Sequence, residues 1–198
     1  MQRVLIIINI FILIGILSGC GDDEIVLGPD ANKLISEGWS EYGAGNYEDA
    51  IAKYEEALAE DATSSEAHNG IGWCKARLGE TRDAIDSFKE AVGKDPGNAD
   101  AHAGLAGAYF ADGDYERAIA SAQSVLSQSP GYSSHHDDIR TADIRVLLAE
   151  CYYSVGDYSA ARAQIDLLGG SGRTLDPSSP TYLADLLSVI EELTRREI

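Results

Sequence analysis

The sequence lacks the short motifs that carry catalysis in common enzyme folds. It has no GxSxG nucleophile turn, no HExxH zinc pair, no GxxxxGK[ST] phosphate loop and no GxGxxG dinucleotide fingerprint. Adjacent carboxylates such as Glu55 and Glu56 fall on predicted helix surfaces, where a solvated face explains them better than an acid/base pair. We therefore predict a protein that is not an enzyme and that needs no cofactor.

Basic residues are also scarce. The chain has 15 Lys and Arg against 33 Asp and Glu, a formal net charge of −18. This charge repels phosphate backbones and gives no attraction to anionic lipid, so we expect no nucleic-acid partner. It favours a protein or peptide partner that is basic, although a high net charge also serves solubility alone.

Cysteine is rare as well, since the chain has only Cys20, Cys74 and Cys151, without any CxxC pair. Cys74 and Cys151 recur at one position of a repeated unit, where the other copies have small residues. We expect them to be buried packing residues. A disulfide between them is not expected, because it needs Cα atoms about 6 Å apart and two whole units separate these cysteines.

The N-terminal segment has the pattern of a targeting signal. Arg3 precedes a mostly apolar run, Val4–Leu17, which is shorter than a membrane-spanning helix. The run ends in LSGC at Cys20, which resembles the bacterial lipobox, in which the peptide is cut before the cysteine and the thiol receives a diacylglycerol. The resemblance implies a lipoprotein signal peptide over residues 1–19, a lipid on Cys20, and a tether over residues 20–30. An ordinary secretory peptide with a chance cysteine at its cleavage site is the alternative.

The residue after Cys20 bears on the membrane. In Gram-negative lipoproteins an Asp at this position commonly retains the protein in the inner membrane, whereas this chain has Gly21. The resemblance therefore implies the periplasmic face of the outer membrane. Ten extended residues reach at most about 35 Å, so the tether keeps the folded part near the bilayer.

The rest of the chain repeats itself. The segment YEDAIAKYEEA, which begins at Tyr47, returns as TRDAIDSFKEA from Thr81 and as YERAIASAQSV from Tyr115, at a spacing of 34 residues. A fourth copy begins at Tyr158 after a longer gap. Copies of one helix at a fixed period indicate a stacked array. The small and bulky residues at set positions resemble the tetratricopeptide repeat (TPR) family, in which each unit is a pair of antiparallel helices.

This resemblance implies an all-α fold, a right-handed α-solenoid of about four TPR helix hairpins with a C-terminal capping helix. Glycines such as Gly38 fall where the two helices of a unit approach closely, and Gly45 falls where a first helix ends in a left-handed residue. The array of residues 31–168 divides into units 31–64, 65–98, 99–132 and 142–168, with an insertion at 131–141 and a capping helix at 179–198.

The insertion, GYSSHHDDIRT, is expected to form a loop on one face of the array. His135, His136 and Asp137 within it are candidate metal ligands. Adjacent histidines in a polar loop are more commonly solvated, and we predict no metal site.

The last helix is expected to begin with Ser179 as its cap and Pro180 at its first position. Its apolar stripe contains Leu183, Leu186, Leu187, Ile190 and Leu193. Such a helix seals the open end of an array, and the alternative is that it docks a partner helix.

In TPR proteins the first helix of each unit lines a concave groove. Carried over by repeat position, the partner-binding groove consists of Trp39, Tyr42, Trp73, Arg77, Phe110 and Tyr153. A row of aromatic side chains suits a peptide with apolar anchors, and the alternative is that the rings pack against the next helix. The clamp that some TPR proteins use for C-terminal carboxylates is absent, because Ile35 and Trp39 stand where it has Lys and Asn.

These features together predict a lipid-anchored adaptor that binds a protein or peptide partner in envelope assembly, secretion or pilus biogenesis, as similar TPR lipoproteins do. The alternative is a structural accessory subunit that self-associates through the convex face or the last helix. A third possibility, an enzyme of envelope carbohydrate metabolism or a metal-binding protein, has no motif to support it.

Overall fold

The structure is a computed structural model that describes residues 30–169 and 175–196. The predicted signal peptide, Cys20 and the tether up to residue 29 lie outside this range. The described residues form helices joined by turns and contain no β-strand, which confirms the all-α prediction. The helices are α2 (Ala31–Ala44), α3 (Tyr47–Glu60), α4 (Ser65–Arg77), α5 (Thr81–Lys94), α6 (Ala99–Asp112), α7 (Tyr115–Gln128), α8 (Thr141–Ser154), α9 (Tyr158–Leu167) and α10 (Tyr182–Arg196).

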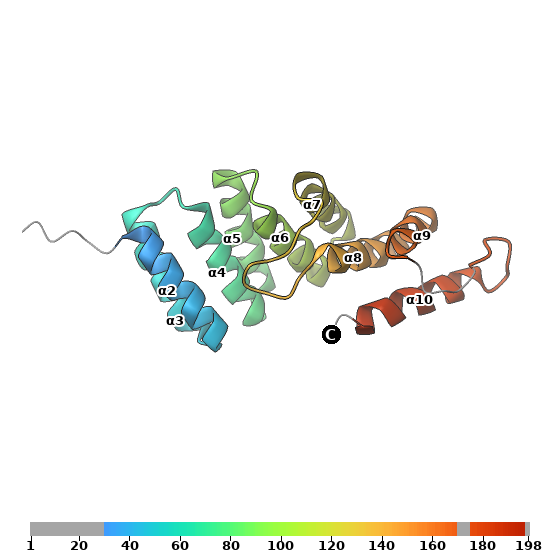
Figure 1. Cartoon of the computed structure of the whole chain (residues 1–198), viewed down its shortest axis with the longest axis horizontal. Helices are drawn as coiled ribbons and strands as arrows, with labels where there is room; N and C mark the ends of the chain where they lie inside the picture. Colours follow the sequence, from blue (N-terminus) through green and yellow to red (C-terminus); the bar gives the residue numbers. More distant parts are fainter. Residues whose placement is uncertain (1–29, 170–174, 197–198) are drawn as a thin grey trace, which may run out of the picture.

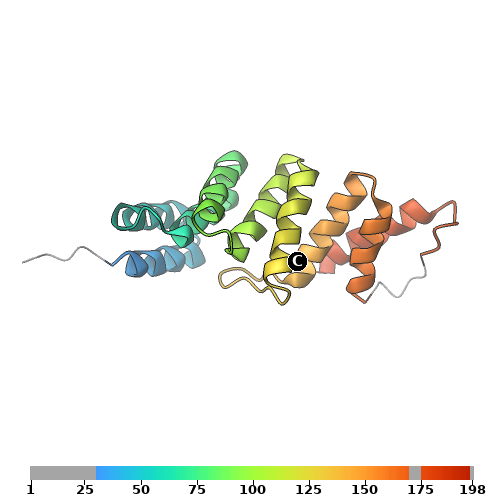
Figure 2. The ribbon, with the colours of Figure 1, turned by 90° about the horizontal axis from the view of Figure 1, so that it is seen from above.

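Eight of these helices form four hairpins, α2–α3, α4–α5, α6–α7 and α8–α9, which stack in a row (Figure 1). Figure 2 shows the same row from above. Each of the first helices α2, α4 and α6 contacts the first helix of the next hairpin, whereas the second helices α3, α5, α7 and α9 lie farther apart from one another. The array therefore curves with its first helices on the inner side, as an α-solenoid of stacked units does.

One large ring from a second helix fills the space between two hairpins. Phe88 of α5 is fully buried between α4 and α6. A Cβ atom added to Gly72 would lie 2.6 Å from the Phe88 ring, and one added to Gly104 would also overlap it. Tyr54 has the equivalent place one unit earlier, again between two glycines. Only glycine leaves room for these rings, so the pairing of glycine and ring sets how closely neighbouring hairpins pack.

The helix ends follow from local sequence. Gly45 and Gly113 end α2 and α6 with φ of 83° and 79°, in the left-handed region that costs glycine little. At the other end, the side chains of Ser64 and Asn98 cap α4 and α6 by accepting hydrogen bonds from backbone N–H groups of the first turn. These residues recur with the repeat, so the hairpin geometry recurs too.

The fourth hairpin begins one residue earlier than the sequence indicated, because Thr141, assigned above to the insertion, is the first residue of α8. The Arg140 N–H donates to Asp143 Oδ2 (2.6 Å), which stabilises this start. The preceding loop is closed on itself by a bridge between Ser133 and Arg140 and by a hydrogen bond from Ser134 N–H to the Ile139 carbonyl (2.8 Å). The insertion is therefore an ordered turn with a defined tip.

The last helix begins at Tyr182, two residues after the predicted first position Pro180, because side chains of Asp176 and Ser179 hold a turn before it. Its buried residues Leu186, Val189 and Ile190 pack against Ala149, Ala161 and Ile165 of the fourth hairpin. Leu183 and Leu187 stay 41% and 36% exposed. Helix α10 thus covers the end of the array and leaves an apolar edge of its own.

Cys74 and Cys151 are buried and unpaired, as expected for packing residues. Burial raises the pKa of each thiol to about 12, so both stay protonated. None of the helices within residues 30–169 and 175–196 combines the length and the hydropathy that a bilayer crossing requires.

Candidate partner-binding groove

The groove is the inner face formed by α2, α4, α6 and α8. The loop between α7 and α8 runs back across α6 and α4 towards α2 (Figure 1). We call residues 131–140 the covering loop. It divides the groove into a covered half on α2 and α4 and an open half that continues from α4 through α6 and α8 to α10.

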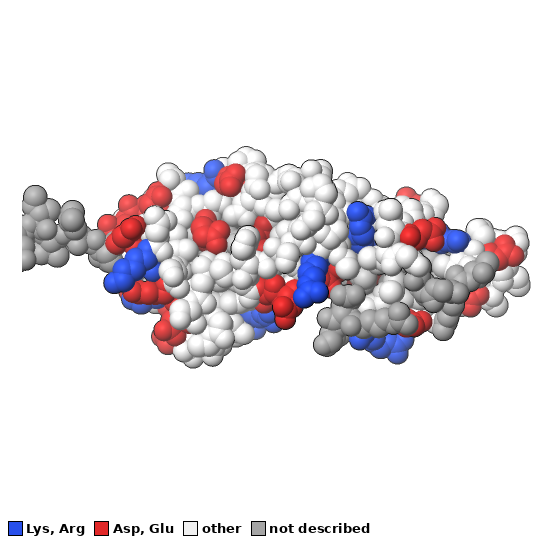
Figure 3. All heavy atoms as spheres, in the orientation of Figure 1, with Lys and Arg blue, Asp and Glu red and all other residues white. Residues whose placement is uncertain are grey.

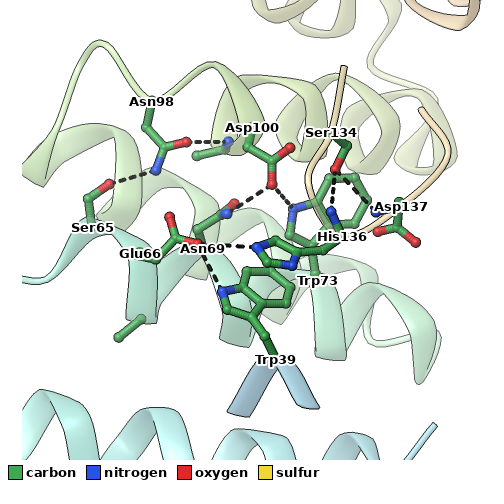
Figure 4. A network of polar contacts seen from close by, with 12 residues as sticks. Trp39, Ser65, Glu66, Asn69, Trp73, Asn98, Asp100, Ser134, His136 and Asp137 are labelled. Carbon is green, nitrogen blue, oxygen red and sulfur yellow. Dashed lines mark hydrogen bonds and ion pairs between the residues drawn. The ribbon is translucent and has the colours of Figure 1, made fainter. Parts of the chain in front are cut away.

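In the covered half, the ring of His136 stacks on Trp39. The ring centroids are 3.5 Å apart and the planes differ by 7° (Figure 4). The Trp39 indole N–H donates to Glu66 Oε1 (2.9 Å), and His136 Nε2 lies 3.7 Å from the same oxygen. Burial lowers the pKa of His136 and raises the pKa of Glu66, since both lose water on the inner face. The loop therefore removes one face of Trp39 from solvent.

The next loop residue, Asp137, uses both carboxylate oxygens. Its Oδ2 accepts a hydrogen bond from the Tyr42 hydroxyl (2.8 Å), and its Oδ1 pairs with the Arg77 guanidinium. Arg77 Nε also donates to the Tyr42 hydroxyl oxygen (3.0 Å), so the three groups form a closed set. Burial raises the pKa of Tyr42, which keeps its hydroxyl a donor. Three of the six predicted groove residues thus contact the chain's own loop.

Trp73, the fourth predicted residue, is only 8% exposed and packs edge-on against Phe88. Its indole N–H donates to Asp100 Oδ2 (3.1 Å). The hydroxyl of Tyr132, at the base of the covering loop, donates to the other oxygen of Asp100 (2.5 Å). The interpretation that these rings pack against the next helix is therefore correct for Trp73, which keeps only a small edge towards the groove.

Each tryptophan thus donates to an acid in the first turn of the next unit, Trp39 to Glu66 and Trp73 to Asp100 (Figure 4). Our sequence reasoning missed this link. The signal was present, because the two acids are separated by the same 34 residues as the two tryptophans.

The open half begins where the third unit departs from this pattern. Gly107 stands at the position of Trp39 and Trp73, and a Cβ atom added to it would meet nothing within 4 Å. A pocket of about 220 Å³ lies here, between α4 and α6. It is lined by Trp73, Ala76, Thr81, Gly104, Gly107, Ala108 and Ala111. Because the third unit has a glycine where the first two units have a tryptophan, a space lined mainly by small residues lies at this position.

A second pocket, of about 200 Å³, lies where α6, α8 and α10 meet. It contains the last two predicted residues, the half-buried Phe110 and Tyr153, and it is lined by Phe110, Glu150, Tyr153, Ser154, Leu187, Ile190 and Glu191. The Tyr153 hydroxyl donates to the Leu183 carbonyl (3.3 Å), and the Thr194 hydroxyl donates to Glu150 Oε1 (2.6 Å), so α10 forms one wall. The pocket offers apolar walls and two carboxylates.

The chemistry of the described residues favours binding over catalysis. Figure 3 shows a face of the array that is mostly uncharged along its middle. Within residues 30–169 and 175–196, no three His, Cys, Asp or Glu side chains are grouped to hold a metal ion. The ring of His136 stacks on Trp39. An inner face with ring-lined pockets and small floor residues suits a polypeptide segment.

An α-solenoid of two-helix units with such an inner face is a scaffold of the kind that binds other polypeptides. Tetratricopeptide repeat models match residues 35–98, 75–133 and 110–177, and the chain belongs to the tetratricopeptide repeat family. Repeats of this family generally mediate protein–protein interaction and do not catalyse reactions.

Several solved structures share the fold. The TPR protein YrrB, described as having an unusual peptide-binding site, has a TM-score of 0.67 and 16% identity, over 84% of this chain and 87% of YrrB. PilW, a type IV pilus biogenesis factor, has a TM-score of 0.61 and 21% identity, over 81% and 69%. The first TPR domain of Spaghetti (RPAP3), bound to an HSP90 peptide, has a TM-score of 0.57 and 19% identity, over 65% and 94%. The comparison with curated protein sequences finds no match.

Proposed function

We propose that this protein is a lipid-anchored TPR adaptor that holds a segment of a protein partner in the open half of its groove. The observation that carries the proposal is the empty space in front of Gly107, continued by the pocket around Phe110 and Tyr153. Both pockets lie on the inner face of neighbouring first helices. A single extended or helical segment can therefore contact both.

The lining of the open half indicates the chemistry of the partner. Phe110, Tyr153 and Leu187 offer rings and an aliphatic wall to apolar anchor side chains. Glu150 and Glu191 beside them, together with a net charge of −18, attract positive charge. The partner segment is therefore basic and carries at least one large apolar anchor.

The proposed location follows from the leader sequence. A lipid on Cys20 and a short tether keep the array at the periplasmic face of the outer membrane, close to complexes of the envelope. Envelope assembly, secretion and pilus biogenesis are the processes that we propose, and PilW, which shares the fold, is a pilus biogenesis factor. One fold relative, the first TPR domain of Spaghetti (RPAP3), is bound to a peptide, which supports the proposal that this chain binds a segment of a partner.

The experiment places a photocrosslinking side chain at position 107 of the full-length, anchored protein in its native envelope. Gly107 points into open space on the inner face, whereas Gly93 of α5 is an exposed helix position that also has nothing within 4 Å of an added Cβ. We expect a discrete crosslinked protein from position 107 and none from position 93, because only the first faces the proposed partner. Equal crosslinking from both positions, or none from 107, would remove the groove as the binding site.

A second candidate function, self-association, is favoured by the exposed Leu183 and Leu187 on α10. Two neighbouring leucines outside the core can pack against the same edge of a second copy. Light scattering on the purified chain separates the two functions, because self-association through α10 gives a particle of twice the chain mass that does not depend on the groove.

A further inference from the structure

The covering loop presents two side chains to the groove as a bound peptide would. His136 lies flat on Trp39, and Asp137 meets Tyr42 and Arg77, two residues of different hairpins. We propose that the covered half is a second peptide subsite, specific for a planar N–H-bearing side chain followed directly by a carboxylate, and that the covering loop is its resident occupant. This inference rests on the proposed function, since both halves belong to one groove.

The shape of the loop supports an occupant role. Its base is fixed by the buried Tyr132 and by the bridge between Ser133 and Arg140, so the tip is presented as a preformed turn. The tip reaches Tyr42, which lies 95 residues away in the sequence. A preformed turn loses little conformational entropy on binding, and the same holds for a rigid ligand.

The contacts of Asp137 and His136 indicate which side-chain groups the subsite binds. Both oxygens of the Asp137 carboxylate are engaged, one by the Tyr42 hydroxyl and one by Arg77, which an amide or an apolar side chain cannot reproduce. The adjacent ring is held by its flat face, and Glu66 Oε1 lies 3.7 Å from its Nε2. An imidazole or an indole, each with a ring N–H, satisfies both demands.

The tether makes the loop a strong competitor. A segment joined to its site by a short linker has an effective concentration in the millimolar range. A free peptide of the same chemistry must exceed this concentration to displace it. Removing the two tip contacts should therefore raise the apparent affinity for such a peptide by about tenfold or more.

The test uses a fluorescently labelled synthetic peptide with the sequence of residues 131–140, GYSSHHDDIR, added to the purified chain. Three proteins are compared by fluorescence anisotropy: the unaltered chain, H136A/D137A, and the control H135A/D138A, which changes exposed neighbours in the same loop. We expect the H136A/D137A variant to bind the peptide at least about tenfold more tightly than the other two. Asp137→Asn alone, which leaves the size of the loop unchanged, should give part of the same gain.

A peptide in which the residues equivalent to His136 and Asp137 are Ala should not bind the vacated variant. Equal binding of the loop peptide to all three proteins, or binding to none, overturns the subsite and makes the loop a permanent strut between hairpins. The proposed function is separately tested, because Gly107→Arg should block the open half and leave the loop peptide unaffected. If only one of the two binding events is observed, loop peptide in the covered half or partner segment in the open half, the other inference is the one that fails.

Discussion

Phe88→Ala should lower the free energy of unfolding by about 3–5 kcal/mol, the range for removing a fully buried aromatic side chain. The Phe88 ring fills the space between the second and third hairpins, and glycines on both sides leave no larger side chain to collapse into the cavity. In a stacked array the interface between neighbours carries much of the stability, so the loss should also reduce the cooperativity of unfolding. Urea unfolding followed by circular dichroism measures both.

The matched control is Phe110→Ala. Phe110 is an aromatic residue of the neighbouring helix α6, but it is only half-buried and lines the open pocket. Its removal should cost distinctly less stability, because less apolar area is lost from the core. If the two variants unfold at the same urea concentration, the ring between hairpins is not the main contact that we take it to be.

Cys20→Ser should abolish lipid attachment, which we expect to appear as complete loss of radiolabelled palmitate from the immunoprecipitated protein. The thiol of Cys20 is the proposed acceptor, and no other cysteine can replace it. Cys74 is buried, and its pKa near 12 keeps the thiol protonated and unreactive. Cys74→Ala should therefore retain full labelling, and palmitate that stays on the Cys20→Ser protein would contradict the anchor.

Much of the fold could be predicted because the residues that determine the geometry of one hairpin recur in each of the four units. Gly45 predicts a left-handed helix end, and Gly38 predicts a close approach of the two helices of its unit. The structure bears out both, with φ of 83° at Gly45 and the Tyr54 ring against Gly38. A spacing of 34 residues then carries the same geometry along the chain.

The candidate site was predicted less completely, because the covering loop has no periodic pattern. The sequence offered His136 and Asp137 as candidate metal ligands and favoured solvated histidines, and nothing local indicates that these residues meet Trp39 and Tyr42 at the far end of the array. The row of anchors predicted from Trp39 and Trp73 does not continue at Gly107, the third member of that series. The departure from the pattern, and not the repetition, marks the open space.

The central claim, that the open half of the groove binds the partner, is tested most directly by isothermal titration calorimetry with the segment captured at position 107. Gly107→Arg fills the space in front of α6, while the control Gly93→Arg adds the same side chain to the exposed end of α5. Neither added Cβ meets an atom within 4 Å, so both folds should stay intact. The account predicts that Gly107→Arg weakens binding at least about tenfold, or about 1.4 kcal/mol, and that Gly93→Arg leaves it unchanged. Equal dissociation constants for the two variants would contradict it.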